Sequence, residues 1–171
     1  MAVIRATLLA CGLLLAACGA AGPATSPATG PATDDVQDGR ARAQSQALPS
    51  DIVRALQTDE RVLDCAQGRR DGRSAFASDW VRWRQPDLDG DGRADWVVEG
   101  VHPCLRRDGA ADWWIYADTP DGRRLLGRVR DVHAVEALPA RSHGYADLRV
   151  RGAQGERILR YRDDGYQEPG G

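Results

Sequence analysis

The sequence predicts a mainly β protein: one short N-terminal helix, then an antiparallel meander of about six or seven strands, in a single small domain. Three observations support this fold class. Short apolar or alternating segments recur from residue 80 to the C-terminus. Turn sequences separate them, such as Thr-Pro-Asp-Gly at 119–122, where Pro presets φ and Gly accepts a positive φ. The stretch 48–171 is long enough to bury one modest core.

The elements are expected in a simple order. A helix runs from Asp51 to about Gln57, with Ser50 as its cap and with Ile52, Val53 and Leu56 on one side. The predicted strands follow as short segments separated by turns: 80–84, 94–101, 112–118, 123–130, 132–138, 146–151 and 157–162, with a final turn at 164–165.

The tryptophans are the natural core anchors, because the chain has five of them and a single Phe. Trp113 and Trp114 are adjacent in one predicted strand, so their side chains must point to opposite faces. We therefore expect at least one of them to be partly exposed. It would either cover the edge of the core or form part of a binding surface.

The first residues have the anatomy of an export signal. Arg5 precedes an apolar run, 6–15, and small residues follow before Cys18. The run is too short for a permanent membrane span, which needs about 20 apolar residues. We therefore expect 1–17 to be a removable signal peptide.

The sequence Leu15-Ala-Ala-Cys18 resembles the lipobox of bacterial lipoproteins. The resemblance implies that Cys18 carries a diacylglycerol and anchors the chain in a membrane without a spanning segment. Gly19, where Asp would retain a lipoprotein at the inner membrane, implies the outer membrane, with the domain facing the periplasm or the exterior. An ordinary secretory signal with an incidental Cys18 is the alternative.

The stretch 18–47 is rich in Ala, Pro, Thr and Gly and contains a repeated Pro-Ala-Thr unit. Because it has few large apolar residues, it is expected to be a disordered tether. The domain organisation is therefore a signal peptide, a lipidated tether, and one β-rich domain at 48–171.

Charge and cysteine content limit the remaining options. The formal net charge is -2 and no basic block is present, so nucleic acid is not an expected partner. Outside the signal and the lipobox, the cysteines are Cys65 and Cys104. In an oxidising compartment they are expected to form one disulfide, although a metal site or a free thiol would use the same residues.

One motif predicts a cofactor. In Asp87-Leu-Asp89-Gly-Asp91-Gly-Arg93-Ala-Asp95 the carboxylates occupy loop positions 1, 3, 5 and 9, with a glycine at position 6. Calcium binds six to eight oxygens, so side chains at alternate positions must converge around a sharp backbone turn. Arg93 stands at position 7, where only its backbone carbonyl is needed. The sequence therefore predicts a structural calcium site.

The loop departs from an EF-hand because position 12 is Val98 and a strand-like segment follows. It resembles the strand-loop-strand calcium loops of FG-GAP and integrin-type propeller repeats, which implies that Asp95 completes the site. A propeller needs at least four such units, and one complete copy is present. The wider chain resembles uncharacterised secreted proteins and lipoproteins of Gram-negative bacteria. A solvated Asp-Gly turn without metal, or a calcium ion that binds substrate, are the alternatives.

Three functions remain open. The favoured one is a monomeric, lipid-anchored interaction module with an envelope or host protein as partner. An inhibitor of a lysozyme or protease would present an exposed loop at 102–112 or 138–144. A metal-dependent hydrolase would place 87–95 in a concave pocket. It is the least favoured, because the chain has no Gly-x-Ser-x-Gly, no phosphate loop and no paired histidine spacing.

Overall fold

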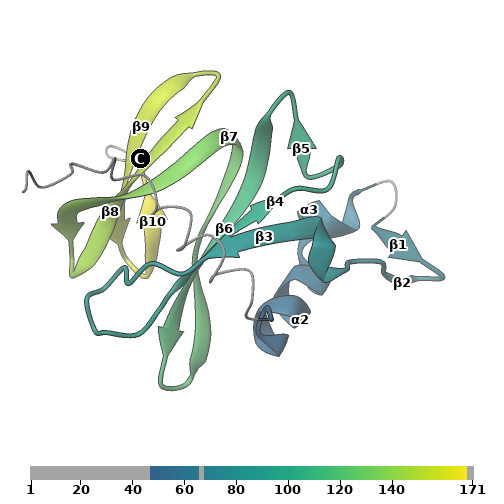
Figure 1. Cartoon of the computed structure of the whole chain (residues 1–171), viewed down its shortest axis with the longest axis horizontal. Helices are drawn as coiled ribbons and strands as arrows, with labels where there is room; N and C mark the ends of the chain where they lie inside the picture. Colours follow the sequence, from purple (N-terminus) through teal and green to yellow (C-terminus); the bar gives the residue numbers. More distant parts are fainter. Residues whose placement is uncertain (1–46, 66–67, 169–171) are drawn as a thin grey trace, which may run out of the picture. The chain divides into compact units, whose positions relative to one another are not determined.

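The computed structural model describes residues 47–65 and 68–168 (Figure 1). The predicted signal peptide, Cys18 and the tether up to residue 46 lie outside the described residues. Among the helices of the described part, none has the length and apolar character needed to cross a membrane.

The described residues confirm the predicted fold class. The helices are α2 (Ser50–Thr58) and α3 (Glu60–Leu63), and a 3-10 turn, η1, covers Ser78–Trp80. A separate two-stranded hairpin pairs β1 (Arg69–Arg70) with β2 (Arg73–Ser74). The remaining strands form one antiparallel sheet: β3 (Val81–Arg84), β4 (Trp96–Gly100), β5 (Arg106–Arg107), β6 (Ala110–Thr119), β7 (Gly122–Ser142), β8 (Tyr145–Gly152), β9 (Gly155–Arg162) and β10 (Gly165–Gln167).

The sheet is a meander in which the short β5 interrupts the chain between β4 and β6. Its strand order is β10-β9-β8-β7-β6-β4-β3, and the short β5 pairs with the start of β6. The strands predicted at 123–130 and 132–138 are one strand, β7, so the expected separation was wrong. A register shift interrupts the pairing of β7 with β6, and Asp131 there has a φ of 53°. Asp tolerates this left-handed conformation, so the chain bulges and continues.

The helix also starts differently from the prediction. Ser50 is the first helical residue, and Pro49 takes the capping position without a side-chain hydrogen bond. The carbonyl oxygen of Pro49 accepts the first backbone hydrogen bond, from the N–H of Val53 at 2.9 Å. The extended ψ of Pro49, 143°, directs the chain into the helix, so no Ser side chain is needed as a cap.

Two separate cores lie on the two faces of the sheet. Trp113 belongs to the first core, which fills the space enclosed by β6 to β10. Trp114 belongs to the second, which α2 and α3 cover beside β3, β4 and β6 (Figure 1). The opposite orientation of the two rings is therefore confirmed. The expected exposure was wrong: the exposed fractions are 6% and 0%, because each face has its own cover.

A buried carboxylate fixes the helices to the second face. Asp59 caps α3 by accepting the N–H of Arg61 at 3.0 Å. Its Oδ2 also accepts hydrogen bonds from the indole of Trp114 at 2.9 Å and from Nε of Arg128 at 2.8 Å. One side chain therefore joins α3 to β6 and β7.

The C-terminal strand closes the first core. β10 pairs with β9 and also packs against the first half of β7. This close approach favours glycine: a Cβ at Gly165 would lie 3.0 Å from the carbonyl oxygen of Leu126, a tight contact with backbone. The hydroxyl of Tyr166 then donates to the carbonyl of Ala146 at 2.8 Å. The start of β8, next to the Asp-rich loop, is thereby held to β10.

Candidate metal centre

The Asp-rich loop, 87–95, connects β3 to β4 and inserts one apolar side chain into the first core. Leu88 has an exposed fraction of 0%. Its carbonyl oxygen accepts hydrogen bonds from the N–H of Ala146 at 2.7 Å and from the guanidinium of Arg141 at 2.9 Å. Arg141 also donates to the carbonyl of Gly144 at 2.8 Å. The loop is therefore attached to the β7–β8 turn and does not extend freely into solvent.

Asp95 is the buried carboxylate of the loop, with an exposed fraction of 1%. Its Oδ2 accepts the N–H of Leu88 at 2.7 Å, and its Oδ1 accepts the N–H of Asp118, at the end of β6, at 2.8 Å. Burial raises the pKa of Asp95, the two backbone N–H groups lower it, and the charges of Asp89 and Asp91 raise it. The net direction is upward, because burial disfavours the ionised form more than the two N–H groups favour it.

Asp87 and Asp89 lie on the accessible side of the same loop. Asp87 accepts the N–H groups of Gly90 at 2.6 Å and Gly92 at 3.1 Å. Asp89 accepts the N–H of Asp91 at 3.1 Å. Both glycines have a positive φ, 80° at Gly90 and 84° at Gly92, which turns the backbone around the carboxylates. The local sequence therefore folds into consecutive Asx turns, as short Asp-x-Asp-Gly segments favour.

The fold brings three of the predicted ligands together. Asp87, Asp89 and Asp95 each offer a carboxylate oxygen, and these atoms lie within 4.8 Å of one another. The side chain of Asp91 forms an ion pair with the side chain of Arg93. The predicted role of Arg93 uses its backbone carbonyl, which this ion pair does not occupy. The N–H of Arg93 also donates to Asp91 at 2.7 Å. The loop therefore holds a three-carboxylate cluster that could bind a metal ion, and Arg93 partly neutralises the fourth carboxylate.

The cluster has the chemistry of a hard-cation site. All three donors are oxygens, and each hydrogen-bonded carboxylate oxygen keeps a second lone pair. Three carboxylates at this separation repel one another when ionised, and a divalent cation would remove the repulsion. The accessible side of Asp87 and Asp89 leaves room for water molecules to complete a coordination shell.

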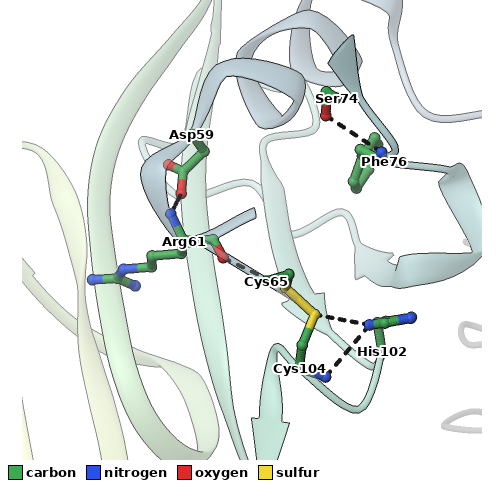
Figure 2. Close-up of a disulfide and its surroundings, with 7 residues drawn as sticks. All are labelled: Asp59, Arg61, Cys65, Ser74, Phe76, His102 and Cys104. Atoms are coloured by element: carbon green, nitrogen blue, oxygen red, sulfur yellow. Dashed lines mark hydrogen bonds between the residues drawn. A yellow bond between two sulfur atoms is a disulfide. The ribbon is translucent and has the colours of Figure 1, made fainter. Parts of the chain in front are cut away.

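The two remaining cysteines form the predicted disulfide. Cys65 follows α3, Cys104 lies in the turn before β5, and their Cα atoms are 5.5 Å apart. Because the two sulfurs are bonded to each other, they are not thiolate ligands, even though His102 lies next to them (Figure 2). Sequence reasoning missed His102 as a neighbour of the disulfide; its His-x-Cys spacing to Cys104 was the available signal.

Two pockets lined by described residues lie away from the loop. One, of about 420 Å³, opens beside the disulfide, between α3, β5 and the start of β6. The other, of about 720 Å³, lies along the β1–β2 hairpin and Phe76. Neither contains a residue of the Asp-rich loop, so these two pockets give no support to a hydrolase centred on it.

Comparison with known proteins adds no family to this description. No family model, no curated protein and no solved structure matches the chain.

Proposed function

We propose that this chain is a lipid-anchored cell-envelope protein whose β domain binds one structural calcium ion and serves as an interaction module for an envelope or host protein. The observation that carries the metal part is the convergence of Asp87, Asp89 and Asp95 on a loop that also plugs the first core. The lipobox-like segment ending at Cys18 supports the anchor. The disulfide supports an oxidising compartment.

Calcium suits the cluster better than other common metals. The absence of sulfur and imidazole among the three donors disfavours zinc and copper. Magnesium demands near-octahedral geometry, whereas calcium accepts six to eight oxygens in irregular arrangements. Here the backbone turns and the hydrogen bonds of Asp95 fix the carboxylates, so the more tolerant ion is favoured.

The contacts of the loop favour a structural role for the ion. Asp95 ties the loop to the end of β6, and Leu88 seals the core beneath it. An ion held by Asp95 and the accessible Asp87 would fasten the outer part of the loop to the part that is buried. Binding to the folded state alone would stabilise it by about 2.7 kcal/mol when calcium is present at about 100 times its Kd.

Calorimetry of the full chain tests the metal site. We expect calcium to raise the melting temperature by roughly 10 °C relative to EDTA at that saturation. Asp89→Asn should abolish this shift, because it removes a converging carboxylate from the accessible side. Asp121→Asn, in the turn at 119–122, is the matched control and should keep it. A melting temperature that does not respond to calcium would refute the metal part of the proposal.

The anchor is tested separately. Membrane fractionation and mass spectrometry of the N-terminal peptide should find Cys18 carrying acyl chains, and Cys18→Ser should release the chain from the membrane. An unmodified Cys18 on a fully soluble chain would contradict the anchor without affecting the calcium site.

The inhibitor alternative is not supported by a particular feature. The segment 102–112 is organised by β5, which pairs with β6, and 138–144 forms the end of the β7–β8 hairpin. Both segments include exposed residues, as this alternative predicts, and exposure alone does not identify a hydrolase as the partner.

A further inference from the structure

The two sulfurs of the disulfide differ in their surroundings. Cys65 is buried, with an exposed fraction of 9%, and Cys104 is exposed. The Nδ1 atom of His102 lies 2.9 Å from the Sγ atom of Cys104, and Figure 2 shows the imidazole ring pointing at that sulfur. The accessible sulfur is therefore also the one with a titratable neighbour.

The hydrogen bonds define how His102 faces this sulfur. The backbone N–H of Cys104 donates to Nδ1 at 3.4 Å, so Nδ1 is an acceptor and the proton of the neutral ring lies on Nε2. The ring is stacked on Trp80, with 4.0 Å between centroids and 16° between planes. The Trp80 face holds the ring in place beside the sulfur. If the disulfide is reduced, Nδ1 can accept the thiol proton of Cys104, which gives a thiolate–imidazolium pair.

A pocket opens beside the same disulfide. It measures about 420 Å³ and includes Cys65 and Cys104 in its wall. Arginines from α3, β5 and β7 line it: Arg61, Arg106, Arg107 and Arg130. The carboxylates facing it are Asp64, Asp112 and Asp131. Arg106 also pairs with Glu99 at 3.6 Å, so the four arginines face four carboxylates, and the pocket gives access to the disulfide without a net positive charge.

We propose that Cys65–Cys104 is a redox-active disulfide, and that it exchanges with thiols that enter this pocket. Cys104 is the sulfur that reacts, His102 stabilises its thiolate, and Cys65 is the buried resolving cysteine. This inference does not depend on the calcium site, because the two sites share no residue.

The exchange balances with two thiols. A first thiolate attacks the Sγ atom of Cys104, the bond to Cys65 breaks, and Cys65 leaves as a thiolate that takes a proton from water. The resulting thiol lies 3.6 Å from the carbonyl oxygen of Arg61, to which it can donate. A second thiolate attacks the outer sulfur of the mixed disulfide, and Cys104 leaves as the thiolate paired with His102. Two thiols become one disulfide, and the protein gains two electrons.

The experiment uses the full chain with glutathione in EDTA. Alkylation followed by peptide mapping reports Cys65 and Cys104 separately from the other cysteines. We expect His102→Asn to slow exchange about tenfold, because Cys104 becomes a poorer leaving group. His133→Asn, an exposed histidine outside the pocket, is the matched control and should exchange at the wild-type rate.

A second readout separates this role from a structural one. In the reduced wild type, the thiolate absorbance of Cys104 should titrate below the value of about 8.5 for a free cysteine, and His102→Asn should move it back. Faster exchange with glutathione than with a short cysteine-containing peptide would identify a small-molecule thiol as the co-reactant. The opposite order would identify a protein thiol. Both orders support the site.

Three results would overturn the proposal. One is a disulfide that glutathione does not reduce while the chain remains folded. Another is a His102→Asn variant with the wild-type rate and the wild-type titration. The third is loss of the native tryptophan fluorescence on reduction, because an unfolded dithiol has no site in which His102 and Cys104 meet.

Discussion

Replacing Asp95 by alanine should separate the scaffolding role of this carboxylate from its role in metal binding. The side chain is 1% exposed and accepts the N–H groups of Leu88 and Asp118. Asp95→Ala leaves both donors without their partner, and an unsatisfied buried donor costs about 1–3 kcal/mol. Removing a buried carboxylate also relieves its own desolvation cost. We therefore expect a net loss of about 3 kcal/mol in the free energy of unfolding in EDTA.

Asp87→Ala is the matched comparison on the accessible side of the loop. The N–H groups that Asp87 accepts, from Gly90 and Gly92, are exposed and can turn to water. Its loss in EDTA should therefore be about 0.5 kcal/mol. In saturating calcium both variants should also lack the increment that the ion gives to the wild type, about 2.7 kcal/mol at 100 times Kd.

Urea unfolding, followed by tryptophan fluorescence, measures the free energy of unfolding of each variant in EDTA and in calcium. An Asp95→Asn chain should fall between wild type and Asp95→Ala, because an amide has one oxygen left to accept one of the two N–H groups. Equal losses for the Ala variants of Asp87 and Asp95 in EDTA would refute the assignment of Asp95 as the scaffold of the loop.

Three further outcomes follow from the same structure. Replacing Cys65 and Cys104 together by serine should lower the free energy of unfolding by about 4 kcal/mol on the chain-entropy model, measured by urea titration, since the bond spans 39 residues. Burial raises the pKa of Asp112, against the lowering effect of nearby arginines, so the folded state holds this proton more tightly than the unfolded chain. The stability should therefore fall as pH rises through the window above the ordinary aspartate value, and Asp112→Asn should flatten that slope in unfolding curves taken at successive pH values. Asp59→Ala should cost about 3 kcal/mol and shift the fluorescence of Trp114, whose indole loses its acceptor; an unchanged emission spectrum would contradict this.

The sequence was sufficient for most strands of the large sheet, but not for the β1–β2 hairpin, for β5 or for the length of β7. It also did not predict which elements cover the two faces of the sheet. Alternation placed Trp113 and Trp114 on opposite faces, as the structure has them. Their burial depends on contacts that alternation does not encode. The indole of Trp114 reaches Asp59, 55 residues earlier in the chain, so its exposure is decided by where α3 packs.

The contacts of the Asp-rich loop also depend on an interaction that residue spacing does not describe. Spacing alone identified Asp87, Asp89 and Asp95 as neighbours, because glycines at the intervening positions turn the backbone around them. Spacing also favoured Asp91, but it did not weigh the guanidinium of Arg93, two residues later. The Asp91 carboxylate pairs with that guanidinium, and the converging oxygens belong to Asp87, Asp89 and Asp95. A short-range charge pair can therefore compete for a carboxylate that a position pattern assigns to the metal.

The Asp-rich loop and the disulfide stabilise different faces of the same sheet. The Asp-rich loop fastens the first core through Leu88, while the disulfide and Asp59 fasten α3 and its neighbours over the second. The two cores share no residue, and β4 and β6 contribute alternate side chains to each. Because sites without shared partners contribute nearly additively to stability, the effects of the cation and of the redox state on the free energy of unfolding are expected to add. One small sheet could thus respond separately to calcium and to thiols.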